Sequence, residues 1–274
     1  MNTPIRKTKI VCTMGPNLFE KHLIAPLMKA GMNVARFNFS HGTYETHQHY
    51  YDEVCRIRDE LGLPIATMLD TKGPEIRVRS FKNGRVTLQN GQLFTLTTDE
   101  VEGDEERVSI TYKELPQDIA VGSSILIDDG LIGMQVERID GADIVCRVLN
   151  GGVVSNNKGV NIPNAHLSMP FISEKDHQDI LFAIKNGYDF IAASFTRCAD
   201  DIMQIRHILQ ENNCHTINII AKIENMEGVE NIDEILRVVD GVMVARGDLG
   251  VEVPLEDVPS LQKKLIQRGI AAGK

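Results

Sequence analysis

The feature that most constrains the fold of this chain is a regular alternation of short apolar runs with longer amphipathic segments. Apolar runs at 8–14, 32–42 and 64–73 have the pattern of buried strands, and helical patterns at 22–31 and 46–62 separate them. Strands that alternate with helices in this way are typical of a parallel sheet. The N-terminal third therefore predicts a βαβαβ arrangement.

The alternation stops once, in a block that is rich in turn residues. From about Glu75 to Gly159 the segments are short, and the pairs Asn90-Gly91, Asp129-Gly130 and Asp140-Gly141 are strong signals for tight turns. This composition predicts a small all-β domain that is inserted between a strand and its helix.

The βα alternation then resumes and continues to the end of the chain. Ser173 and Asp176 form a capping box at the start of the next helical pattern, and Gly187 ends it. Apolar runs at 188–195, 216–225 and 240–250 each precede a helical pattern, at 198–210, 229–239 and 258–273. Six βα units with polar residues at the strand ends favour an α/β fold of the (β/α)8 TIM-barrel type, truncated after about six units. The pattern alone leaves a doubly wound open sheet as the alternative. The predicted domains are 1–72 and 161–274 for the two parts of the barrel and 73–160 for a β lid.

Composition limits the partners and the compartment. The net charge of −9 opposes binding to nucleic acid or to an anionic membrane surface, so a phosphate-bearing ligand needs a local cluster of basic residues. The five cysteines are scattered and include no CxxC pair, which favours a reducing compartment. No apolar run resembles a signal peptide or a membrane span. We therefore expect a cytoplasmic protein.

Glu224 and Asp248 are candidate ligands for a metal ion, because each follows an apolar run and the two runs are neighbours. Two carboxylates with substrate oxygens and water suit Mg²⁺, although each residue is equally suited to cap the helix that follows. Lys222 lies on the same side of the extended chain as Glu224. It would stabilise charge on a transferring phosphoryl group or an enolate, or it would simply pair with Glu224.

The stretch "ARFNFSH" predicts a second group of polar side chains. Arg36, Asn38 and Ser40 alternate along it and so share one face, where an arginine and two oxygen-bearing side chains suit phosphate and a monovalent cation. Asp70 and Thr71 could supply further oxygens. A closing lid could bring Arg77 and Lys158 onto a phosphate, and otherwise both are solvated surface charges. We interpret six histidines as solvated residues without a ligand role: His22, His47, His49, His177, His207 and His215.

The stretch "VMVARGDLGVEVP" places an anion site beside the proposed metal ligand. Gly247 allows the backbone to approach a ligand, and free N–H groups at the start of the next short helix suit a small anion. Arg246 could bind that anion, but a structural role for its side chain is the stronger interpretation.

Over its whole length the chain closely resembles the pyruvate kinase family. Seven motifs occur in the family's order: "TKIVCTMGP", "GMNVARFNFSHG", "LDTKGPEIR", "NKGVNIP", "DFIAASF", "AKIEN.EG" and "GVMVARGDLGVEVP". The resemblance implies phosphoryl transfer from phosphoenolpyruvate to ADP, giving pyruvate and ATP, with Mg²⁺ and K⁺ as cofactors. It implies the catalytic residues Lys222 and Arg36. It implies Mg²⁺ ligands Glu224 and Asp248, and K⁺ ligands Asn38, Ser40, Asp70 and Thr71. The implied nucleotide-binding residues are Arg36, His41, Arg77 and Lys158, and the implied seat for the substrate carboxylate is Ala245, Arg246, Gly247 and Asp248. Glu75 is similar to the residue of the potassium-dependent branch.

The resemblance also implies two further βα units, with a threonine that protonates the enolate, and a C-terminal domain beyond Lys274. We therefore interpret the chain as an N-terminal portion of a parent enzyme that is typically a homotetramer. Three functions remain open: the phosphotransferase itself, a catalytically incompetent piece that binds substrate and metal, and, more distantly, a Mg²⁺-dependent lyase of pyruvate enolates. The open strand edges of such a piece would favour self-association.

Overall fold

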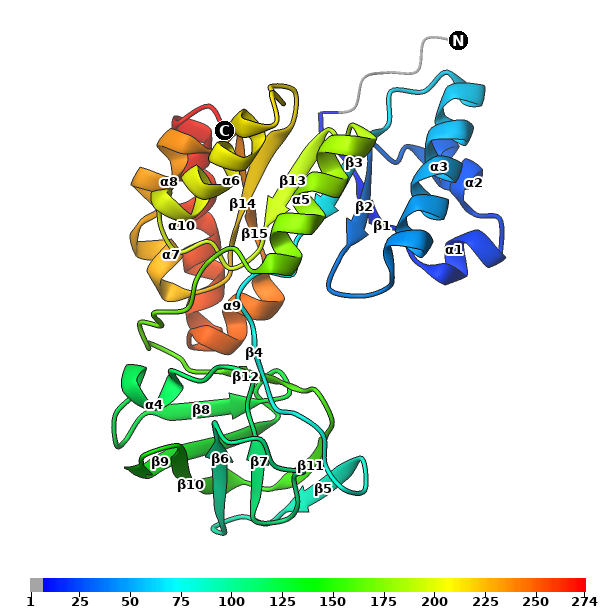
Figure 1. Cartoon of the computed structure of the whole chain (residues 1–274). Helices are drawn as coiled ribbons and strands as arrows, with labels where there is room; N and C mark the ends of the chain where they lie inside the picture. Colours follow the sequence, from blue (N-terminus) through cyan, green and yellow to red (C-terminus); the bar gives the residue numbers. More distant parts are fainter. Residues whose placement is uncertain (1–6) are drawn as a thin grey trace.

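The structure is a computed structural model, and it describes residues 7–274. Six parallel strands form one curled sheet in the same order as in the sequence (Figure 1): β1 (Val11–Thr13), β2 (Val34–Asn38), β3 (Ala66–Asp70), β13 (Phe190–Ala193), β14 (Asn218–Ile223) and β15 (Gly241–Val244). A doubly wound sheet reverses its strand order at a switch point, and this sheet does not. The barrel-type fold predicted from the alternation is therefore confirmed. Within the described residues, β1 and β15 each pair with one neighbour only, so the sheet has two open edges.

The helices that follow the strands include α3 (Tyr44–Leu61), α5 (Glu174–Asn186), α6 (Ala199–Glu211) and α10 (Val258–Ala271). The capping box of Ser173 and Asp176 starts α5, and Gly187 ends it with a positive φ of 69°. The structure also contains α1 (Pro16–Glu20) and α2 (Ile24–Ala30) between β1 and β2. The single helix predicted over 229–239 is wrong in detail, because Asn231 separates α7 (Met226–Glu230) from α8 (Ile232–Val238). The short helix α9 (Arg246–Glu252) and a 3₁₀ turn (Leu255–Asp257) precede α10.

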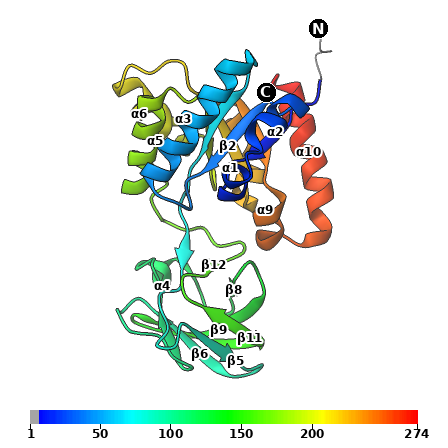
Figure 2. The same cartoon turned by 90° about the vertical axis from the view of Figure 1, so that its right-hand side faces the viewer.

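The β-rich block forms a separate body below the curled sheet (Figure 2). Its seven-stranded sheet has the order β4 (Ile76–Arg77), β12 (Gly159–Asn161), β8 (Ser124–Ile127), β9 (Ile132–Asp140), β10 (Asp143–Asn150), β6 (Leu93–Thr97) and β7 (Arg107–Ser109). A second sheet pairs β5 (Arg85–Leu88) with β11 (Gly152–Ser155), and one short helix, α4 (Leu115–Asp118), is included. Gly91, Gly130 and Gly141 all have positive φ, which is the reason for glycine in these turns.

Each of the two bodies has its own hydrophobic core. One core lies between the curled sheet and its helices and includes Phe37, Leu69 and Ile223, and the other fills the β block and includes Phe94, Leu96 and Ile125. The chain crosses between the bodies twice, just after β3 and just after β12. The domain limits 72/73 and 160/161 lie close to these crossings and stay a prediction. No helix within residues 7–274 is long and apolar enough to cross a membrane.

Candidate active site

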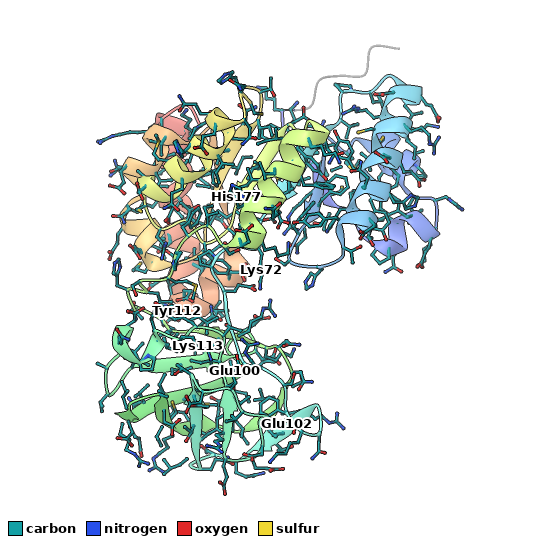
Figure 3. All side chains as sticks on the ribbon, in the orientation of Figure 1. Lys72, Glu100, Glu102, Tyr112, Lys113 and His177 are labelled. Atoms are coloured by element: carbon teal, nitrogen blue, oxygen red, sulfur yellow. The ribbon has the colours of Figure 1, made fainter. Side chains whose placement is uncertain are left out.

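The carboxyl ends of the parallel strands and the first crossing enclose a cavity of about 170 Å³. Because parallel strands end on the same rim, polar residues just after β2, β3, β13, β14 and β15 converge there. The lining residues are Arg36, Asn38, Ser40, His41, Lys72, Glu75, Arg77, Ser194, Phe195, Lys222, Glu224 and Asp248. Lys72 lies where the curled sheet meets the β block, near the lower end of α5 (Figure 3).

Lys222, on β14, is the buried cation of this cavity. Its Nζ lies 2.8 Å from Glu224 Oε1 and 3.2 Å from Asp70 Oδ1. The ammonium also donates a hydrogen bond of 2.7 Å to Ser194 Oγ. Burial acts to lower the pKa of Lys222, but the two carboxylates outweigh it, and the net pKa is raised. The side chain is therefore a permanent positive charge at the cavity wall.

Glu224 is fully buried at the end of β14. Its Oε2 accepts a hydrogen bond of 2.6 Å from the backbone N–H of Phe195, a residue with a positive φ of 56°. Burial raises the pKa of Glu224 to about 7, although Lys222 and the Phe195 N–H act in the opposite direction. The contact of Oε1 with Lys222 is an ion pair without the geometry of a hydrogen bond, so this buried oxygen has no hydrogen-bond donor among the described residues.

Arg36, on β2, is held at the edge of the same cavity. Its Nε donates to Asp70 Oδ2 at 2.5 Å, a second guanidinium nitrogen pairs with the same oxygen, and Nη1 donates to Thr13 Oγ1 at 2.7 Å. Asp70 thus accepts from Arg36 through one oxygen and faces Lys222 through the other. The ion pairs of Asp70 with Arg36 and Lys222 therefore connect the ends of β2, β3 and β14.

The other oxygen-bearing residues predicted near a monovalent cation lie at the ends of β2 and β3. Asn38 Oδ1 accepts from the backbone N–H of Ser40 at 3.0 Å, and both residues line the cavity. Thr71 is buried, and its hydroxyl donates to the backbone oxygen of Ala192 at 3.3 Å. The structure places the four predicted K⁺ ligands around one strand pair. Their role as a K⁺ site stays a prediction.

Three of the four predicted nucleotide-binding residues lie at the junction of the two bodies, and the fourth, Arg36, lines only the small cavity. A larger cleft of about 570 Å³ between them includes His41, Arg77 and Lys158 in its lining. Arg77 pairs with Glu75 through two nitrogens, at 2.8 and 3.1 Å, and Lys158 Nζ lies 2.8 Å from Asp128 Oδ1. Arg77 and Lys158 therefore each have an acidic partner within the β block or its first crossing, and both side chains line the cleft.

The predicted carboxylate seat is the first turn of α9. Asp248 lines both cavities, which brings its carboxylate near Glu224, whereas Ala245, Arg246 and Gly247 are not among the residues that line them. Arg246 is exposed. The assignment of these three residues to a substrate stays a prediction.

One histidine interpretation is wrong. His47 is 8% exposed, its ring stacks on Phe39 with 3.9 Å between ring centroids, and its Nε2 lies 2.7 Å from the backbone oxygen of His41. The reason is that this face of α3 packs against the end of β2, and burial lowers the pKa of His47. His22, His49, His207 and His215 are exposed, and His177 is half-buried.

The residues of the small cavity fit a divalent cation with oxygen ligands. No group of three or more His, Cys, Asp or Glu side chains within residues 7–274 is arranged to hold a metal ion by itself. Two carboxylates, Glu224 and Asp248, nevertheless share the cavity, and Glu224 Oε1 is buried without a hydrogen-bond donor. Mg²⁺ usually takes only one or two carboxylates and completes its shell with water and substrate oxygens.

A barrel-type rim with a buried lysine, two carboxylates and an arginine is the kind of site that suits anionic, phosphate-bearing ligands. Residues 5–274 match the family model "Pyruvate kinase, barrel domain", and the chain belongs to the pyruvate kinase family. It is 50% identical over 272 residues to a pyruvate kinase of Staphylococcus haemolyticus and 51% identical over 271 residues to one of Geobacillus stearothermophilus. Each match covers 98% of this chain but 46% of the relative, so the chain spans about half the length of these relatives. A solved pyruvate kinase from Cryptosporidium parvum matches with a TM-score of 0.94 and 40% identity, over 98% of this chain and 56% of the other.

Four residues of the cavity were not predicted as site residues: Lys72, Glu75, Ser194 and Phe195. Lys72 stands inside the quoted motif "LDTKGPEIR", so the motif could have indicated it. Ser194 and Phe195 follow the apolar run of β13 directly, and the rule that polar residues after barrel strands face the site could have indicated Ser194.

Proposed function

We propose that this chain carries the substrate-binding and metal-binding half of a pyruvate kinase, which transfers the phosphoryl group of phosphoenolpyruvate to ADP. The observation that carries the proposal is the placement of Lys222 between Asp70 and Glu224 at the wall of a cavity that Asp248 and Arg36 also line. The membership in the family supports the reaction, and the proposal includes the family's glycolytic role, cytoplasmic location and homotetrameric parent enzyme.

In this reaction the bond between phosphorus and the enol oxygen of phosphoenolpyruvate breaks, and a terminal oxygen of ADP forms the new bond to phosphorus. The electron pair stays on the enolate, whose carbon then takes up a proton. Lys222 would stabilise the negative charge on the transferring group and on the enolate oxygen, since it is a buried, permanently charged donor. Arg36 would bind the phosphoryl oxygens from the end of β2.

Glu224 and Asp248 would hold Mg²⁺, which neutralises charge on the oxygens of both substrates. Asn38, Ser40, Asp70 and Thr71 would hold K⁺. The backbone from Ala245 to Asp248 would receive the substrate carboxylate. Arg77, Lys158 and His41 line the larger cleft and would bind the nucleotide phosphates there, with the β block closing over them as a lid.

A second candidate function is binding of substrate and metal without turnover. The observation that favours it is the open sheet, in which β1 and β15 each have one partner within the described residues. The lyase alternative has no such support, since the chain belongs to the pyruvate kinase family.

A coupled assay for pyruvate separates these functions. The chain and its Lys222→Met variant are given phosphoenolpyruvate, ADP and Mg²⁺, with and without K⁺, and phosphoenolpyruvate binding is measured by calorimetry. Turnover that needs both ions and is lost in the variant supports the kinase. Mg²⁺-dependent binding without turnover supports the second candidate. A well-folded chain that shows neither contradicts both.

A further inference from the structure

The hydroxyl of Ser194 lies at the centre of the charged network, and the proposed reaction assigns it no role. It follows β13 directly and is 2% exposed. Its Oγ accepts a hydrogen bond of 2.7 Å from Lys222 Nζ and lies 2.7 Å from Thr71 O and 3.1 Å from Asp70 Oδ1. A hydroxyl has one proton to donate, so it accepts from the ammonium and donates to the end of β3.

The position of this hydroxyl is fixed by the backbone on both sides. The Ser194 N–H donates to Thr71 Oγ1 at 3.1 Å, and the next N–H, of Phe195, donates to Glu224 Oε2 at 2.6 Å. Gly73 packs against the same backbone so closely that a Cβ there would lie 2.8 Å from Ser194 O. Ser194 therefore presents a rigidly placed acceptor to a long and flexible lysine side chain.

Charge alone does not fix the direction of the Lys222 N–H bonds. The attraction of Asp70 and Glu224 holds the ammonium between them, but an ammonium has three donors that rotate about the last carbon–nitrogen bond. Ser194 supplies a neutral oxygen that accepts a hydrogen bond from the ammonium, whereas the contacts with the two carboxylates are ion pairs. Arg36 and Lys222 balance Asp70 and Glu224, and a further carboxylate in place of Ser194 would add negative charge that opposes an anionic substrate.

We propose that Ser194 is a positioning residue that orients the Lys222 ammonium at the cavity wall and ties it to the end of β3. The identity of the anionic ligand that the oriented ammonium would bind, phosphoenolpyruvate, rests on the proposed function. The orientation of Lys222 is a property of the unliganded chain and is tested without any ligand.

The first measurement is an NMR spectrum of the chain with ¹⁵N at the lysine side chains. An ammonium that is buried and hydrogen-bonded exchanges its protons slowly and gives its own signal, and the Lys222→Met variant identifies the signal of Lys222. We expect Ser194→Ala and Ser194→Cys to lose or broaden it. Cysteine keeps one heavy atom at the γ position but is a poor acceptor, so a role limited to filling that position would leave the Ser194→Cys signal intact.

The matched control is Thr196→Ala, which also removes a buried hydroxyl two residues away. The Thr196 hydroxyl donates to the backbone oxygen of Ala193 at 3.0 Å and is not among the residues that line the cavity. We expect the Lys222 signal of this variant to match that of the unchanged chain.

The second measurement is phosphoenolpyruvate binding by calorimetry with Mg²⁺ and K⁺ present. Loss of one hydrogen bond to a charged group predicts weaker binding in both Ser194 variants by about tenfold, and unchanged binding in Thr196→Ala. If the unchanged chain binds no phosphoenolpyruvate, the proposed function fails while the NMR result still decides the role of Ser194. A Lys222 signal that is absent from the unchanged chain, or that persists in folded Ser194→Cys, overturns the inference.

Discussion

The Lys222 ammonium lies 2.8 Å from Glu224 Oε1, and this fully buried oxygen has no hydrogen-bond donor among the described residues. Lys222 is on β14, and Glu224 follows the last residue of that strand, Ile223, so one short stretch of chain builds the pair. A carboxylate oxygen with a lone pair left free beside a cavity is suited to bind a metal ion. The ion pair with Lys222 holds Glu224 in place and leaves a lone pair of its Oε1 available to a metal ion.

The first prediction concerns competition between Mg²⁺ and a proton at Glu224. Burial raises the pKa of Glu224 to about 7, and a metal ligand must be deprotonated, so metal binding should release a proton below that pH. We expect Mg²⁺ affinity to fall about tenfold for each pH unit below about 7. Calorimetry between pH 5.5 and 8, in buffers of different ionisation enthalpy, would count the proton. An affinity that is flat over this range would contradict the prediction.

The same shift predicts how stability depends on pH. The folded state holds the Glu224 proton more tightly than the unfolded chain, so this contribution to stability is fully present below about 4.5 and is lost as the pH rises through about 7. The Glu224→Gln variant cannot titrate there. We expect the unfolding free energy of the unchanged chain to fall by about 3 kcal/mol relative to this variant between pH 4.5 and 8. Urea unfolding of both proteins at several pH values checks it, and parallel curves would refute it.

The third prediction concerns Gly73, which has a positive φ of 70° and no room for a side chain. A Cβ at this position would lie 2.8 Å from Ser194 O. Gly187 is the matched control, because it has φ of 69° and nothing within 4 Å of an added Cβ. We expect Gly187→Ala to lower the unfolding free energy by about 1 kcal/mol, and Gly73→Ala to lower it further and to shift the Lys222 NMR signal. Equal losses in the two variants would mean that the contact with Ser194 has no consequence.

The charged residues that line this cavity could be predicted from the sequence, because each strand end carries a polar residue after an apolar run. Lys222, Glu224 and Asp248 stand out since a charge beside buried strands needs a reason. Ser194 did not stand out, because a serine after a strand is common and its partners Thr71 and Lys222 lie 123 and 28 residues away. No local pattern contains that information.

The barrel order was predictable from the alternation of strands and helices, but finer features were not. His47 has polar neighbours in the sequence, and its burial depends on how α3 packs on Phe39. The helical spacing of apolar residues continues on both sides of Asn231. The helix nevertheless breaks there, since the Asn231 side chain donates to Arg197 O at 3.0 Å. Both outcomes depend on tertiary contacts and not on the local spacing of apolar residues.

The fourth prediction concerns the second crossing between the β block and the barrel. Asn161, on β12, donates to Glu252 Oε1 at 2.7 Å, and Glu252 belongs to α9, the helix that carries Asp248. Burial raises the pKa of Glu252. We expect Asn161→Ala to increase amide hydrogen exchange in α9 and at the crossing, because it removes the donor to the half-buried Glu252 carboxyl group. Glu252→Gln keeps an acceptor oxygen and should stay close to the unchanged chain. Exchange that is unaltered in Asn161→Ala would show that this hydrogen bond does not hold the two bodies together.

The fifth prediction concerns the edges of the six-stranded sheet, where β1 and β15 each have one partner strand among residues 7–274. Unpaired strand edges tend to pair with another chain, and Val11, on the edge strand β1, is 46% exposed. We expect the chain to self-associate in a concentration-dependent way, and Val11→Lys to reduce this association, since a lysine on an edge strand opposes pairing. Leu93→Lys is the matched control, because Leu93 is 45% exposed on β6, a strand of the β block with neighbouring strands on both sides. Light scattering after size-exclusion chromatography over a range of concentrations measures the mass. A monodisperse monomer at every concentration, or equal effects of the two lysines, would show that the β1 edge does not drive association.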